Sequence, residues 1–130
     1  MIGLDTTAII DMFKGDINLK KVIEELNDVF GLTIINYQEI MFGIDKDNPK
    51  HKIEEEFYDA LISRIFFFNM DIKSSKKAAE IFYDLKRKGF DIGQFDCMIA
   101  SIFLMNGVNK IITRNVKHFI NIPGLKVISY

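Results

Sequence analysis

Residues 1–13 read MIGLDTTAIIDMF, and this stretch decides the fold. Met1–Leu4 is a short apolar run that ends at Asp5, as a buried strand would. The polar residues Asp5 to Thr7 then lead into Ala8–Phe13, and Lys14-Gly15-Asp16 closes this piece. We interpret it as a strand, a turn and a short helix.

The same alternation continues along the chain. Further strands are expected at Val29–Ile35, Ile65–Met70, Lys110–Thr113 and Lys126–Ser129, and further helices at Asn18–Asn27, Tyr37–Ile44, Lys52–Ser63, Ser74–Lys88, Phe95–Met105 and Asn115–Phe119. Asn36 is the expected N-cap of the helix that starts at Tyr37. Such alternation is typical of a parallel sheet with helices on both faces, so we predict an α/β fold.

Composition limits the classes of protein to consider. With 130 residues, 48% of them apolar and 27% charged, the chain is expected to form one globular domain over residues 1–130. The net charge of -1 gives no support for a non-specific nucleic-acid binder, which is usually basic. The single Cys97 favours a reducing cytosol. Uninterrupted apolar runs such as Ile65–Phe68 are far shorter than the ~20 residues of a membrane span.

Asp96 is the most informative candidate for a functional site. Ile99, Ala100 and Phe103 follow it at helical offsets, which places the carboxylate on the apolar face of its helix. A buried carboxylate without a partner is costly and tends to take up a proton or bind a cation. The alternative is that Asp96 caps its helix just after Gly93.

Two further acids are expected to join Asp96, because the carboxyl ends of parallel strands meet at one edge of a sheet. Asp5 follows the first strand, although it would also serve as an N-cap. Glu39 lies on the short helix after the second strand, where the alternative is a solvent-exposed edge. Like charges at ~4 Å repel by about 4 kcal/mol at a dielectric near 20, so their convergence calls for a cation. Oxygen ligands without a His/Cys cluster favour Mg²⁺ or Mn²⁺ over Zn²⁺.

Four segments together resemble the PIN-domain family, and more narrowly its VapC-type toxin branch. The segments are GLDTTAIID at 3–11, IINYQEIMFGI at 34–44, DIGQFDCMIASIFLMNG at 91–107 and KIITRNVKHFINIPGLKVI at 110–128. The resemblance implies a three-layer α/β/α sandwich with a central parallel sheet. It also implies metal-dependent endonucleolytic cleavage of RNA, a cognate antitoxin and a homodimer. By position, Asp5, Glu39 and Asp96 match the core acids of the family.

Asn115 is a departure, because many relatives carry a fourth acid at its position, although Asn also occurs there. The neutral amide favours one firmly bound ion, with recruitment of a second ion by the substrate as the alternative. Asn115 is a candidate to orient a metal-bound water. Thr6, Thr113 and Arg114 are candidate substrate-binding residues, and for Thr113 a hydrogen bond to a carboxylate is the alternative. For Arg114 the roles of phosphate ligand and solvated loop residue stay open. Asp91 is expected at the surface or as a cap, and His118 as a local hydrogen-bonding residue.

Two other functions stay open. A phosphotransfer enzyme of the haloacid-dehalogenase type would need a second Asp two positions after the first, and this chain has Thr7 there. A receiver-like domain is disfavoured as well, because its paired acids and strand-end Lys are not evident. A non-catalytic binding module that keeps the PIN fold is consistent with Asn115 and with the near-neutral charge.

Overall fold

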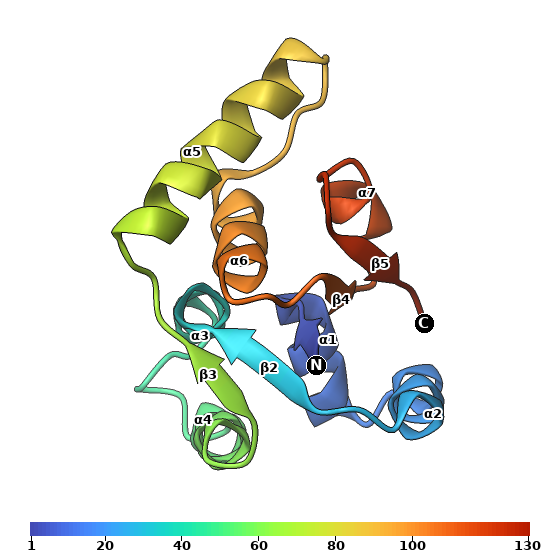
Figure 1. Ribbon diagram of the computed structural model, residues 1–130. Helices are drawn as coiled ribbons and strands as arrows, with labels where there is room; N and C mark the ends of the chain where they lie inside the picture. The colour runs from blue at the N-terminus through green and yellow to red at the C-terminus, as the bar shows by residue number, and fades with distance from the viewer.

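A computed structural model describes residues 1–130, and its centre is a parallel five-stranded sheet (Figure 1). The strands are β1 (Ile2–Leu4), β2 (Phe30–Thr33), β3 (Phe66–Phe68), β4 (Lys110–Ile112) and β5 (Lys126–Ile128), in the order β3-β2-β1-β4-β5. The helices are α1 (Thr6–Lys14), α2 (Ile17–Leu26), α3 (Ile34–Phe42), α4 (His51–Ile62), α5 (Ile72–Arg87), α6 (Gln94–Met105) and α7 (Val116–Phe119). Every strand pair is parallel, which confirms the predicted α/β fold.

The two faces of the sheet carry separate hydrophobic clusters. One cluster joins α5, α6 and α7 to the sheet through residues such as Leu85, Phe103 and Phe119. The other joins the helices α1 to α4 to the opposite face, with Tyr58 at its largest buried position. Figure 1 shows α6 and α7 on one side of the strands and α2 and α4 on the other. The result is the predicted three-layer sandwich.

The strand order reverses beside β1, which decides where a site can form. The chain runs from β1 outward through β2 to β3, then crosses back to β4 on the other side of β1. The crossover leaves a gap between the loops that follow β1 and β4, the place where open α/β sheets bind ligands. Asp5 follows β1 and Thr113 follows β4, and the Asp5 amide donates to the Ile112 carbonyl at 3.0 Å.

The prediction that Asn36 caps a helix starting at Tyr37 is wrong. The helix begins three residues earlier, at Ile34, and its N-cap is Thr33. Asn36 is instead the third helical residue and completes a capping box with Thr33. The β-branched Ile34 and Ile35 resemble strand residues, but the side-chain hydrogen bonds of the cap end β2 at Thr33.

None of the seven helices has the length and apolar character that a membrane span requires.

Candidate metal centre

Three elements carry the predicted acids to the carboxyl edge of the sheet. Asp5 stands at the end of β1, Glu39 lies in α3, and Asp96 lies in the first turn of α6. Their charges influence one another: the carboxylates of Asp96 and Asp5 both raise the pKa of Glu39 in addition to the larger effect of burial. An open depression of about 320 Å³ between α3 and α6 is lined by Glu39 and Asp96.

Asp5 is held by hydroxyl groups rather than by a basic side chain. It is 3% exposed, and its Oδ2 accepts hydrogen bonds from Thr7 Oγ1 and Thr113 Oγ1, both at 2.8 Å. Thr113 Oγ1 in turn accepts from the backbone amide of Asn115 at 2.9 Å. Asp5 occupies the N-cap position of α1 but forms no capping hydrogen bond. Its carboxylate therefore links the loops that follow β1 and β4.

Glu39 receives one hydrogen bond within the protein. Thr6 Oγ1 donates to its Oε1 at 2.7 Å, and Thr6 itself accepts from Asn36 Nδ2 at 3.0 Å. Burial is the largest cause of the raised pKa of Glu39, and the Thr6 hydrogen bond opposes it. The charged form of Glu39 is thus disfavoured where it stands, which is a reason for a cation to bind there.

Asp96 lies on the apolar face of α6, as its spacing predicts. Ile99, Ala100 and Phe103 are all fully buried, and the Asp96 side chain is 17% exposed. His118 Nδ1 lies 2.9 Å from Asp96 Oδ2. Burial raises the pKa of Asp96, the charge of His118 opposes that rise, and the charge of Asp5 adds to it.

Each of the three acids leaves one carboxylate oxygen without a hydrogen bond from the protein. These oxygens are Asp5 Oδ1, Glu39 Oε2 and Asp96 Oδ1, and none is a buried unsatisfied atom. No lysine or arginine forms an ion pair with any of the three acids. As the side chains stand, no three His, Cys, Asp or Glu residues are close enough to hold one ion together. The donor set suits a hard divalent cation, and binding by all three acids would require side-chain movement.

The other predicted residues lie around this edge in different ways. The Asn115 side chain occupies the N-cap position of α7 and forms no hydrogen bond there. The Arg114 guanidinium donates to Asp11 at 3.1 Å, while its side chain stays 55% exposed. Asp91 is exposed, as expected of a surface residue. Cys97 is buried and has its pKa raised to about 11, which does not suit a nucleophile.

Sequence reasoning missed several contacts around this edge of the sheet. His118 reaches Asp96 from α7, and Asn36 reaches Thr6 from α3; neither pairing leaves a signal in local spacing. Asp11 is 2% exposed and accepts hydrogen bonds from Arg114 and from Tyr130, the latter at 2.6 Å. An acid within the apolar run of α1 is a signal that would have suggested a buried partner.

Comparisons with known proteins agree with this geometry. The profile of the PIN domain matches residues 2–125. The ribonuclease VapC2 of Rickettsia felis is 27% identical over 99 residues, which cover 76% of this chain and 72% of that protein. The tRNA(fMet)-specific endonuclease VapC of Salmonella typhimurium is also 27% identical, over 97 residues, 74% of this chain and 71% of that protein.

A solved structure extends the likeness to the whole chain. It is the VapBC2 complex of Rickettsia felis bound to a DNA fragment of its promoter, with a TM-score of 0.84 and 25% identity. The match covers 100% of this chain and 99% of that chain. These findings confirm the resemblance to the PIN domain and to its VapC-type branch.

Proposed function

This chain belongs to the PIN-domain family, and from that premise we propose that it is a metal-dependent endoribonuclease, the toxin of a toxin–antitoxin pair. Its curated relatives are named as a ribonuclease and as a tRNA-specific endonuclease. The observation that carries the proposal is the set of three acids at the strand-order reversal. Each is held through one oxygen, the other oxygen is open, and no lysine or arginine compensates the charge.

Asp5, Glu39 and Asp96 would hold the ion through their open oxygens. PIN-domain nucleases generally need divalent metal ions. A bound Mg²⁺ or Mn²⁺ polarises a phosphodiester and lowers the pKa of a bound water. Thr7 and Thr113 orient the Asp5 carboxylate through hydrogen bonds to its Oδ2.

The remaining candidates of the sequence differ in how open they are to a substrate. We assign to the free Asn115 amide the orientation of the attacking water. Arg114, which is exposed, remains a proposed substrate-binding residue and would have to exchange Asp11 for a phosphate. The hydroxyls of Thr6 and Thr113 are buried on Glu39 and Asp5, so we propose that these two residues act on the substrate only through the acids that they hold. Because Asn115 is neutral, we propose one firmly bound ion, so calorimetry should give a stoichiometry of one Mn²⁺ per chain.

The test is RNA cleavage by the purified protein. Total RNA should be cut in Mn²⁺ or Mg²⁺ and should stay intact in EDTA. Asp5→Asn and Asp96→Asn should lose most of the activity while the melting profile stays cooperative. Asp91→Asn is the matched control, because Asp91 is exposed and forms no hydrogen bond with the three acids. Full activity in both site variants would reject the proposal.

Two alternative functions predict other results. Tight Mn²⁺ binding without cleavage of any RNA would favour a non-catalytic binding module. This alternative is suggested by Asn115, which stands where many relatives carry a fourth acid. A phosphoaspartate at Asp5 would favour phosphotransfer of the haloacid-dehalogenase type. The position that needs a second acid in that chemistry holds Thr7, whose hydroxyl donates to Asp5.

The proposal includes partners and location. The matched VapBC2 structure is a complex with DNA, and we propose that this chain pairs with an antitoxin protein, forms a homodimer and works in a reducing cytosol. Light scattering on the purified chain should give the mass of two copies of the 15.1 kDa protomer. A mass of one copy would remove the homodimer from the proposal.

A further inference from the structure

We propose that Asn36 is a positioning residue that sets the direction of the Thr6 hydroxyl and thereby holds Glu39 for the metal ion. The inference rests on the proposed function, because it assumes that Glu39 is a ligand. A continuous set of hydrogen bonds runs from Thr33 through Asn36 and Thr6 to Glu39, and we call it the Asn36 relay. Its three bonds measure 2.8, 3.0 and 2.7 Å in that order.

The direction of the relay follows from its first bond. The backbone amide of Thr33 can only donate, so the Asn36 atom that it contacts must be the oxygen Oδ1. The Thr33 hydroxyl also donates to Oδ1, at 2.8 Å. The Asn36 amide therefore cannot be flipped, and its NH₂ group must face Thr6 Oγ1. Because Thr6 Oγ1 accepts there, its single proton is directed at Glu39 Oε1.

Burial protects this direction from competition by water. Thr33 and Asn36 are fully buried, and Thr6 is 9% exposed. A hydroxyl in water changes its partner freely. The Thr6 hydroxyl, in contrast, donates to Glu39 Oε1 and accepts from Asn36 Nδ2. With Oε1 occupied, Glu39 presents Oε2, which receives no hydrogen bond from the protein. The relay thus fixes which oxygen of Glu39 is open.

Helix capping does not account for the whole of Asn36. The capping box needs only the Thr33–Asn36 contacts, and α5 completes the same box with a serine at the third position. There Ser74 Oγ accepts from the Asp71 amide at 2.8 Å, and all the hydrogen bonds of this hydroxyl are with Asp71. The Nδ2 group of Asn36 is additional, and it crosses from α3 to α1 to reach Thr6. Glu39 lies one helical turn after Asn36, on the same side of α3.

The comparison of the capping boxes of α3 and α5 suggests the variant to test. In Asn36→Ser the hydroxyl can still cap α3, as it does in α5, but nothing donates to Thr6. We expect the Mn²⁺ affinity measured by calorimetry to fall about tenfold, the lower end of the effect of residues that orient metal ligands. Asn36→Asp is the second variant, because its oxygen keeps the bonds from Thr33 while the donor is lost. Gln38→Glu, on an exposed residue of α3, measures the effect of added charge alone.

A double-mutant cycle separates positioning from a purely structural role. Thr6→Val removes the hydroxyl through which Asn36 acts, so adding Asn36→Ser to it should cause no further loss of Mn²⁺ affinity. Thr6→Ser, which keeps a hydroxyl, should retain the affinity of the wild type. An effect of Asn36→Ser that persists in the Thr6→Val background would overturn the proposal. So would wild-type affinity in both folded Asn36 variants.

Crystal structures without metal complete the experiment. Glu39 should occupy one conformer in the wild type, with Oε1 on Thr6, and several conformers in Asn36→Ser. An unchanged single conformer in the variant would contradict the inference even before metal is added. If the wild type binds no Mn²⁺ while Glu39 loses its order in the variant, the proposed function fails and the relay stands.

Discussion

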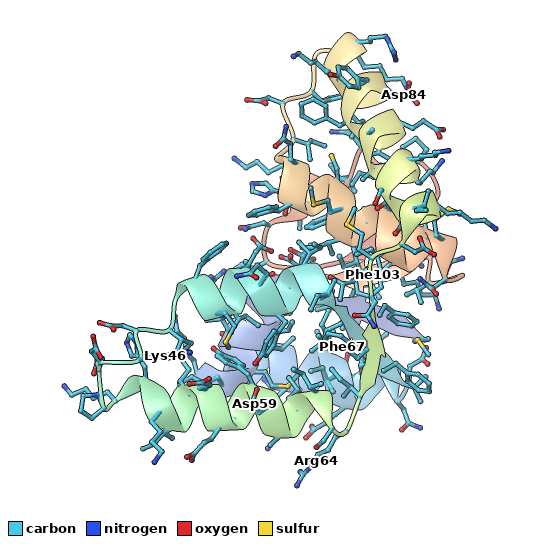
Figure 2. All side chains as sticks on the ribbon, turned by 90° about the vertical axis from the view of Figure 1, so that its left-hand side faces the viewer. Lys46, Asp59, Arg64, Phe67, Asp84 and Phe103 are labelled. Atoms are coloured by element: carbon cyan, nitrogen blue, oxygen red, sulfur yellow. The ribbon has the colours of Figure 1, made fainter.

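Gly3→Ala tests the packing of β1, the strand that leads to Asp5, against α6, the helix that carries Asp96. Gly3 lies in β1, two residues before Asp5, and Phe103 extends from α6 to the sheet, where Figure 2 labels it. A Cβ at Gly3 would lie 2.5, 2.6 and 2.8 Å from three carbons of the Phe103 ring. Ordinary contact begins at 3.4 Å, so ring and strand would have to separate by about 0.9 Å (3.4 minus 2.5).

The Phe103 ring lies inside the hydrophobic core. Phe103 is fully buried, and its ring packs edge-on against Phe68 with the centroids 6.1 Å apart. Overpacking of this kind costs roughly 1–3 kcal/mol. For a chain of this length that corresponds to a fall in melting temperature of roughly 4–12 °C. Since α6 also carries Asp96, the Mn²⁺ affinity should fall with the stability.

Scanning calorimetry at neutral pH measures the effect. Gly43→Ala is the matched control, because Gly43 has a φ of -88° and a Cβ there would meet only the Ile40 carbonyl, at 3.3 Å. It should change the melting temperature little. Adding Phe103→Leu to Gly3→Ala should recover part of the loss, since the smaller side chain vacates the contact. A Gly3→Ala protein that melts like the wild type would refute the packing described here.

Three further results are expected. The raised pKa of Asp96 means that its charged form destabilises the fold, so Asp96→Asn without metal should melt above the wild type at neutral pH; a lower melting temperature would contradict this. With the pKa of Glu39 raised as well, the fold holds these protons more tightly than the unfolded chain does. As the pH increases above the ordinary carboxyl range, the metal-free protein should therefore become less stable and its affinity for Mn²⁺ should rise. Calorimetry at pH 5 and pH 7 measures both changes. Asp11→Ala leaves the hydroxyl of Tyr130 and the guanidinium of Arg114 without their acceptor, which should cost about 1–3 kcal/mol in urea unfolding; an unchanged midpoint would show that the buried cluster is dispensable.

Much of the fold was predictable because its signals are local. An apolar run that ends at Asp5, followed by a helical segment, predicts β1 and α1, and the repeated alternation predicts parallel pairing. The start of α3 was not predictable in this way. Ile34 and Ile35 favour a strand by their branching, and only the side-chain bonds of Thr33 and Asn36, which form in the folded cap, turn them into a helix.

The candidate site was likewise predictable only where its signal lies within one element. Asp96 could be found because a carboxylate on an apolar helical face is unusual within one element. Thr113 was predicted to bind a ligand or a carboxylate, but the acid that it contacts could not be named, because Asp5 lies 108 positions away. His118 was expected to form only local hydrogen bonds, whereas it reaches Asp96 from α7. Such contacts depend on strand order and side-chain conformation, neither of which leaves a periodic pattern in the sequence.

The most direct test of the metal centre is a crystal structure of the protein soaked in Mn²⁺, with anomalous diffraction data. We predict one strong anomalous peak between Asp5 Oδ1, Glu39 Oε2 and Asp96 Oδ1, with the side chains drawn together around it. The absence of a peak at this edge of the sheet under saturating Mn²⁺, or a peak that contacts none of the three acids, would contradict the account.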